Sequence, residues 1–202
     1  MILSKKVILT FILLFFLSLN LKASKWTDWK ETNFVPIKFN DIQQLIGNGS
    51  FINSYSEGQM GAGKKATQYW IENYSSEGYL ILNYLKMPQG WIITDSGNDK
   101  KYIISEAQYL LNVDRKDNPI RKIKKRDIER YRDVHNNVVP YVFFDYENSS
   151  CIIFKKGFFK RDSGFVVSAN DDETLSGVFC KNQDTIDQNF AHQLINSIQV
   201  EQ

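Results

Sequence analysis

The spacing of apolar residues predicts an amphipathic helix at the end of the chain. Ile186, Phe190, Leu194 and Ile198 recur every four residues, which places them along one face of a helix. Asp184 precedes this stripe and is the expected N-cap, because an aspartate side chain accepts hydrogen bonds from the free amides of the first turn. We expect the stripe to pack on a sheet.

Two further helices are predicted from similar spacing. Apolar residues between positions 42 and 46 form a short stripe, with Asn40 as the expected N-cap and Gln43 three residues later, as in a capping box. Gly47 follows and is expected to end this helix. Residues 103–113 are predicted to form another short helix, because their apolar residues also repeat at helical spacing.

Between the helices, the pattern changes to short runs rich in aromatic and β-branched residues, which is typical of strands. Turn-forming residues separate the runs, so we expect consecutive strands to pair as an antiparallel meander. We therefore predict an α+β fold for residues 24–202, a single domain in which a short N-terminal helix and a C-terminal amphipathic helix pack on the sheet. The expected strands are residues 51–54, 66–74, 79–85, 91–94, 128–134, 138–146, 151–154, 165–167 and 175–180.

Residues 1–23 have the layout of a secretory signal peptide. Lys5 and Lys6 precede an uncharged, mostly apolar core at 7–19, and Ala23 is a small residue suited to cleavage. The core is shorter than the roughly 20 apolar residues of a membrane-spanning helix, and an uncleaved anchor is the alternative. No second long apolar run follows, so the chain is expected to be soluble after cleavage and to be periplasmic or secreted.

Cys151 and Cys180 are the only cysteines, and each borders a predicted strand. An oxidising compartment favours a disulfide between them, with two buried free thiols as the alternative. In the chain-entropy model, a loop of this length stabilises the fold by roughly 3–4 kcal/mol. The spacing is far from Cys-x-x-Cys, so we expect a structural clasp beneath the C-terminal helix rather than a reactive pair.

The small positive charge of the whole chain comes from the leader. The chain has 25 Lys and Arg against 23 Asp and Glu, and removal of Lys5, Lys6 and Lys22 with the leader reverses the excess. The overall charge therefore gives no indication of nucleic-acid binding. Residues 115–132 remain strongly basic after cleavage, with nine Lys and Arg against three acids.

This basic segment is the predicted surface for a partner. It would suit an anionic lipid headgroup, an acidic glycan or another envelope protein. A solvated face is the alternative reading, because charged runs are often exposed without binding anything. Nucleic acid is a poor partner for an exported protein, and Tyr131 alone adds an aromatic ring to the segment. We name the candidate surface the basic tract and assign to it Arg121, Lys122, Lys124, Lys125, Arg126, Arg130 and Arg132.

A glycine-rich segment at residues 58–65 fits the phosphate-binding loop pattern up to its last position. Lys65 stands there in place of the Ser or Thr that would hold magnesium. Such a loop also needs a following helix, because the N-terminus of that helix cradles the phosphate. The residues that follow have a strand pattern, so we predict a hairpin loop and no cofactor.

The sequence offers few groups for catalysis. His135 and His192 are the only histidines. His135 lies beside a predicted turn and is expected to be exposed, and His192 lies off the apolar stripe of the last helix. No recognisable nucleophile accompanies either one, and the consecutive acids at 171–173 lack the alternating spacing of a calcium loop. We therefore predict no catalytic residues and no metal site.

Cys151 begins an apolar run, residues 177–180 form a second run that ends in Cys180, and an amphipathic helix closes the chain. This arrangement, over about the last sixty residues, resembles a group of small secreted proteobacterial proteins with no assigned function. Those proteins tend to have aromatic residues at both positions before the second cysteine, whereas Val178 takes the first position here. The resemblance implies export and a disulfide, and it brings no catalytic residues.

The leading hypothesis is an exported, non-enzymatic binding protein whose partner is anionic. One alternative is an envelope hydrolase, which would require His135 or His192 in a cleft within hydrogen-bond reach of a serine, a cysteine or a carboxylate. The other alternative is a structural component of the cell envelope, which would have a flat surface without a pocket.

Overall fold

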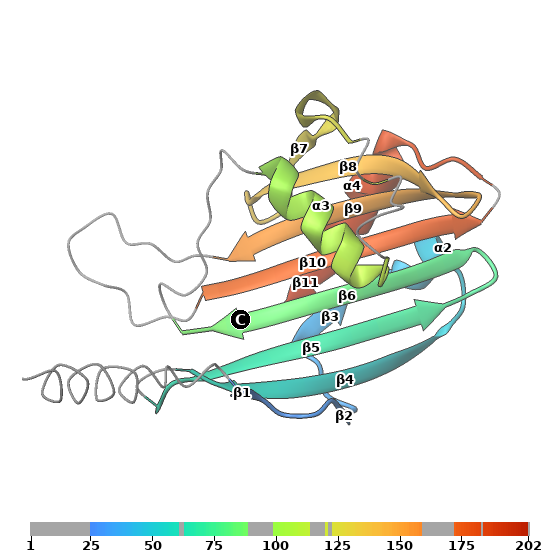
Figure 1. The fold of residues 1–202 in the computed structure, drawn as a ribbon. Helices are drawn as coiled ribbons and strands as arrows, with labels where there is room; N and C mark the ends of the chain where they lie inside the picture. The colour runs from blue at the N-terminus through green and yellow to red at the C-terminus, as the bar shows by residue number, and fades with distance from the viewer. Residues whose placement is uncertain are drawn as a thin grey trace, which may run out of the picture.

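A computed structural model describes residues 25–60, 63–88, 99–113, 120, 123–158, 172–182 and 184–201. These residues form one nine-stranded sheet, one two-stranded sheet and three α-helices (Figure 1). The prediction of a mixed α+β fold dominated by antiparallel sheet is confirmed. The predicted leader at residues 1–23 and the predicted strands at 91–94 and 165–167 lie outside the described residues.

The large sheet has the order β1-β4-β5-β6-β10-β9-β8-β7, and β2 also pairs with β4, while β3 and β11 form the small sheet. Helix α3 (Asp99–Leu110) overlaps the helix predicted at 103–113, but it begins and ends earlier. The strands are β1 (Lys25–Trp26), β2 (Lys30–Glu31), β3 (Ile37–Phe39), β4 (Ser50–Gln59), β5 (Lys65–Tyr74), β6 (Gly78–Met87), β7 (Glu129–Arg132), β8 (Val138–Tyr146), β9 (Ser149–Phe158), β10 (Asp172–Asn182) and β11 (Ile198–Val200). The helices are α2 (Ile42–Ile46), α3 (Asp99–Leu110) and α4 (Gln188–Ser197), with a 3-10 turn, η3 (Lys125–Asp127).

The large sheet consists of two antiparallel meanders. Strands β4 to β6 form the first and β7 to β10 the second, and β10 pairs with β6 to join them. Short turns set the pairing of β8 with β9 and of β5 with β6. Between β8 and β9, Glu147 and Asn148 have φ of 48° and 65°, the positive values that a two-residue hairpin turn requires. Between β5 and β6, the Ser75 N–H donates to the Gly78 carbonyl oxygen at 2.9 Å.

One face of the sheet packs against α2, α4 and the small sheet. Successive side chains of a strand point to opposite faces, so alternate residues of each strand contribute to this core. Phe179 of β10 stacks on Phe190 of α4 with ring centroids 5.3 Å apart. Buried members of this core include Ile37, Ile42, Ile46, Ile71, Leu80, Leu82, Tyr84, Tyr141, Ile152, Phe154, Leu175, Phe179, Leu194, Ile195 and Ile198.

The other face packs against α3, which crosses in front of the sheet in Figure 1. Cys151 and Cys180 stand directly opposite each other on β9 and β10 and form a disulfide, with an S–S distance of 2.08 Å. The expectation that this clasp lies beneath the C-terminal helix is wrong. Both cysteines belong to the core under α3, whereas the neighbouring Ile152 points to the α4 face, because the side chains of β9 alternate.

Helix α4 begins later than its apolar stripe suggests. Its N-cap is Asp187, whose Oδ1 accepts a hydrogen bond from the Phe190 N–H at 2.7 Å. The predicted cap, Asp184, instead binds Nζ of Lys181 at 2.6 Å and accepts from the Thr185 N–H at 2.8 Å. Two neighbouring aspartates are equally good caps by type, so residue type alone did not identify the start of the helix.

Helix α2 occupies the predicted residues, but the capping box is wrong. Its N-cap is Asp41, which has φ of 52° and makes no side-chain cap hydrogen bond. Gly47 ends the helix with φ of 80°, a conformation that favours glycine. In the described ranges, no helix combines the length and the hydropathy needed to cross a membrane.

Candidate functional site

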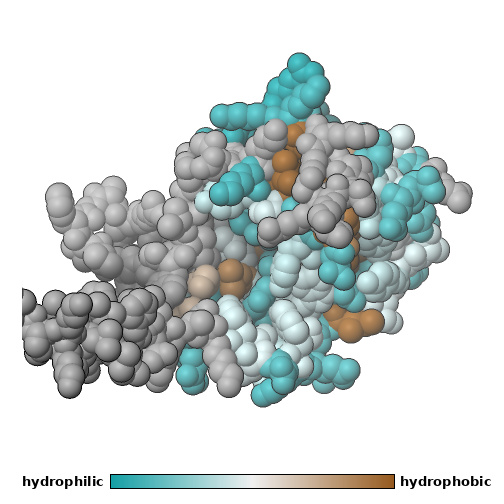
Figure 2. Space-filling view, in the orientation of Figure 1, coloured by the Kyte–Doolittle hydropathy of each residue, from teal (hydrophilic) through white to brown (hydrophobic). Residues whose placement is uncertain are grey.

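The basic tract lies at one edge of the large sheet, in and around η3 and β7. Arg121 and Lys122 are outside the described residues. Figure 2 shows a hydrophilic projection at the top of the view, where the chain around β7 lies in Figure 1. The described members of the tract are all exposed, and they are Lys124, Lys125, Arg126, Arg130 and Arg132.

Asp127 organises the turn that carries the lysines. Its Oδ2 accepts from the Lys124 N–H at 2.7 Å, and its Oδ1 lies 3.8 Å from Nε of Arg126. An exposed ion pair of this kind contributes about 0–1 kcal/mol. Arg132 donates from Nη1 to the carbonyl oxygen of Asn136 at 3.4 Å, in the turn after β7. The tract therefore presents its positive charge to solvent.

On the other face of β7, side chains join a hydrogen-bond network with α4. The Tyr141 hydroxyl donates to Oε2 of Glu129 at 2.5 Å and lies 3.2 Å from Nε2 of His192. Nε2 of Gln188 donates to the same Glu129 oxygen at 3.0 Å. His192 stacks on Tyr131 with ring centroids 3.9 Å apart. Burial, followed by the hydrogen bond to Glu129, raises the pKa of Tyr141 to about 12.

This network fastens the edge strand to α4. Within the described residues, no hydrogen bond joins either histidine ring to a serine, a cysteine or a carboxylate. His135 is exposed, as predicted, and its main-chain N–H donates to Asp133 at 3.0 Å. A base that activates a nucleophile must contact it, so these contacts give the hydrolase hypothesis no support.

A buried cation on β9 was not predicted. Only 1% of the Lys156 side chain is exposed. Its Nζ donates to the carbonyl oxygens of Ile195 and Ile198 at 2.5 and 2.7 Å, and it lies 3.5 Å from Oδ2 of Asp133. Carbonyl groups at the end of a helix lack helical partners and carry partial negative charge, so a cation is favoured there. Lys156 thus holds the end of α4 against the sheet.

Asp133 balances the charge of Lys156 and shapes the turn between β7 and β8. Its Oδ1 accepts from the main-chain N–H groups of His135 and Asn137 at 3.0 and 2.9 Å. Burial alone would raise the pKa of the Asp133 carboxyl, but the hydrogen bonds from Asn137 and the charge of Lys156 hold this pKa below its usual value. Burial lowers the pKa of Lys156 more than the charge of Asp133 raises it.

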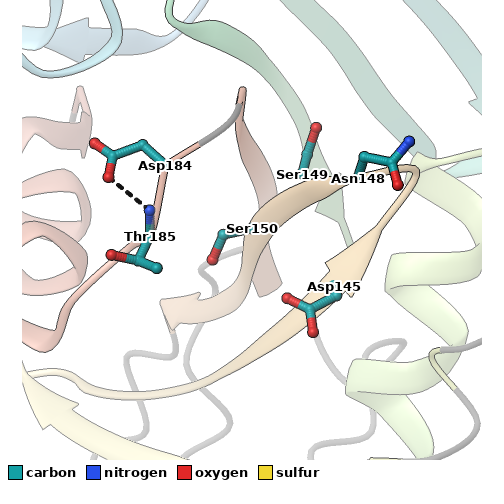
Figure 3. A pocket seen from close by; sticks show the side chains of 6 residues that line it. All are labelled: Asp145, Asn148, Ser149, Ser150, Asp184 and Thr185. Carbon is teal, nitrogen blue, oxygen red and sulfur yellow. Dashed lines mark hydrogen bonds between the residues drawn. The ribbon is translucent and has the colours of Figure 1, made fainter.

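A pocket of about 460 Å³ lies between the β8–β9 turn and the segment that leads into α4 (Figure 3). Its lining offers carboxylate, amide and hydroxyl groups but no cation, so it is distinct from the basic tract. Asp184 is already paired with Lys181. No cluster of three His, Cys, Asp or Glu side chains suited to a metal occurs in the part of the chain that is described. The lining residues are Asp145, Asn148, Ser149, Ser150, Asp184 and Thr185.

The glycine-rich segment forms a hairpin loop between β4 and β5, as predicted. The Met60 N–H donates to the Lys64 carbonyl oxygen at 2.7 Å, and Lys65 begins β5. Residues 61 and 62 lie outside the described residues. A phosphate-binding loop requires a helix after the glycines, and here a strand follows.

Comparisons with protein families, with curated proteins and with solved structures found no match to this chain. The disulfide is consistent with an oxidising compartment. The function is therefore argued from the surfaces of the molecule itself.

Proposed function

We propose that this protein is exported to the periplasm or secreted, with residues 1–23 as its leader, and that it binds an anionic partner through the basic tract without catalysing a reaction. One observation carries the proposal: every described cation of the tract is exposed and lies on a short turn or the strand beside it. A concentrated patch of one sign attracts an oppositely charged partner and accelerates the encounter.

The competing explanation assigns the same charges to protection of the sheet. β7 is an edge strand, and charged side chains on an edge discourage pairing with other chains. That explanation predicts good solubility and no affinity for polyanions. The two explanations therefore differ in a binding measurement and not in a stability measurement.

The experiment compares retention of the purified protein by vesicles that contain phosphatidylglycerol, by immobilised heparin and by immobilised poly-glutamate. A variant with Lys124→Glu, Lys125→Glu and Arg126→Glu should lose retention by whichever polyanion holds the wild type. The matched control reverses three exposed lysines at the opposite end of the sheet, Lys30, Lys64 and Lys65, and should keep most of the retention. Failure of the wild type to bind any of the three polyanions, or an equal loss in the control, would overturn the proposal.

A further inference from the structure

The outer edge of β8 is only partly covered. β7 pairs with β8 from Val138 to Tyr141, whereas β8 continues along β9 to Tyr146. Residues 142–146 therefore have a strand on one side and, among the described residues, no strand on the other. The opposite edge of the sheet differs, because both β1 and β2 pair with β4 there. An uncovered edge presents N–H and C=O groups that can pair with another chain.

The main-chain groups of Phe143 and Asp145 point out of the sheet at this edge. The Cα atoms of Cys151 and Cys180 are 4.1 Å apart, a short spacing typical of a non-hydrogen-bonded antiparallel pair. The N–H and C=O of Cys151 therefore face β8, where its partner is Phe144. The directions of the main-chain groups alternate along a strand, so the N–H and C=O groups of Phe143 and Asp145 point away from β9. Within the described residues, neither makes a main-chain hydrogen bond outside the sheet.

Opposite charges flank the uncovered segment. Glu129 begins β7 and pairs with Tyr141, so η3, which comes just before β7, lies near the start of the segment. The three cations at positions 124–126 outnumber the two acids there, Asp127 and Glu129, so this end carries a net positive charge. Asp145 and Glu147 are exposed and lie at its other end. A segment that is positive at one end and negative at the other is complementary to its own antiparallel copy.

We propose that two copies of this protein form a two-fold symmetric dimer by antiparallel pairing of residues 142–146 about Phe144. Phe143 of each protomer exchanges main-chain hydrogen bonds with Asp145 of the partner subunit. The η3 cations of each protomer face the acidic end of the other segment. The interface is isologous, because both protomers use the same patch, and it covers this edge on both.

The charge pattern favours a second copy over an acidic peptide from another protein. Such a peptide would be attracted by η3 but repelled by Asp145 and Glu147 at the other end. Both proposals use the η3 cations, but the dimer requires no anionic partner. Sedimentation velocity in the absence of a polyanion tests the dimer, and retention by a polyanion tests the proposed function, so the failure of one can be told apart from the failure of the other.

The first test compares Asp145→Pro with Asp145→Ala by sedimentation velocity, with the disulfide intact. Proline removes the outward N–H, alanine keeps it, and both remove the carboxylate. The wild type should dimerise within a range of about 1 µM to 1 mM, and the proline variant should dimerise about tenfold or more weakly than the alanine variant. Equal thermal melting of the two variants would show that the proline has not unfolded the strand.

The second test is a charge swap across the interface. Lys124→Glu with Lys125→Glu, or Asp145→Lys alone, should each weaken the dimer, because like charges then meet. The combined variant should recover dimerisation, because the charges are again opposite. The proposal would be overturned if the wild type stays monomeric throughout the concentration range. It would also be overturned if Asp145→Pro dimerises as strongly as Asp145→Ala, or if the combined charge-swap variant does not recover dimerisation. Retention of poly-glutamate that Asp145→Pro weakens and Asp145→Ala does not would assign this edge to an acidic peptide and would also overturn the proposal.

Discussion

Two regions of this protein use positive charge in opposite ways. Lys156 is buried in the core between the sheet and α4, and each direction in which its ammonium can donate meets a carbonyl oxygen or a carboxylate. The lysines of the basic tract are exposed on a turn at the sheet edge. The first cation is committed to the fold, and the second set is available to a partner.

The difference teaches where to look for function in this fold. A buried charge must be satisfied internally, since desolvation would otherwise cost several kcal/mol. An exposed charge contributes little to stability, so a dense group of such charges points to solubility or to binding. Each region therefore predicts a different response to substitution.

The largest effect is expected for Lys156→Met. The substitution keeps the length of the side chain but leaves Asp133 as an unpaired buried charge and the carbonyl oxygens of Ile195 and Ile198 without their donor. We expect a loss of about 3–5 kcal/mol in the free energy of unfolding, measured by urea denaturation. Lys155→Met on the same strand is the control and should cost less than about 1 kcal/mol, because Lys155 is partly exposed and pairs with Glu106. Equal losses in the two variants would contradict this account of Lys156.

The disulfide stabilises the opposite face of the sheet, and its contribution can be compared with that of Lys156. Replacing both Cys151 and Cys180 by alanine should lower the free energy of unfolding by roughly 3 kcal/mol, mainly because the unfolded chain gains freedom. Reduction of the wild type by dithiothreitol in urea should give a similar shift. A double variant as stable as the oxidised wild type would show that the bond contributes nothing beyond its buried sulfur atoms.

Acid should weaken the anchor around Lys156. The pKa of Asp133 is lowered in the folded protein, so its contribution to stability is fully present above the pKa of the unfolded chain, near 4, and is lost as the pH falls through the lower folded value. Urea denaturation at a series of pH values from 7 to about 3 should show this loss. Asp133→Asn removes the titrating group, and an unchanged pH profile in that variant would contradict the assignment.

A smaller effect is expected at the other end of α4. Asp187→Ala removes the side chain that accepts the Phe190 N–H and should cost about 1 kcal/mol. Asp184→Ala serves as the control, because Asp184 does not cap the helix, and it should cost less. The reverse order of the two losses would restore Asp184 as the effective cap.

The smallest effect on stability is expected in the basic tract. Reversal of Lys124, Lys125 and Arg126 to glutamate should change the free energy of unfolding by less than about 0.5 kcal/mol, because exposed charges away from special features have small effects. Urea denaturation of this variant and of the wild type measures the change in the free energy of unfolding. A loss comparable to that of Lys156→Met would mean that the tract serves the fold, and the contrast between the two regions would disappear.

Local signals in the sequence were sufficient for most of the secondary structure. Turn residues such as Asn148 and the glycines of the β4–β5 loop separate the strands, and β-branched and aromatic runs fill them. The pairing of β10 with β6 could not be predicted, because it joins strands that are far apart in the chain and no local pattern specifies it. The pairing of β11 with β3 was missed for the same reason, and because both strands have three residues.

The sequence carries a signal for the buried lysine. Ile152, Phe154 and Lys156 occupy alternate positions of β9, so Lys156 is in phase with the side chains that face α4. The same alternation places Cys151 on the α3 face. The exposure of the basic tract, by contrast, follows directly from its charge density.

The most direct test of the central claim is the salt dependence of binding to the polyanion that retains the wild type. The account predicts that the affinity falls steeply as the salt concentration rises. Reversal of Lys124, Lys125 and Arg126 should lower the affinity at least tenfold at low salt. Reversal of Lys30, Lys64 and Lys65 should leave the affinity nearly unchanged. Affinity that is insensitive to salt, or equal in the two charge-reversed variants, would contradict the account.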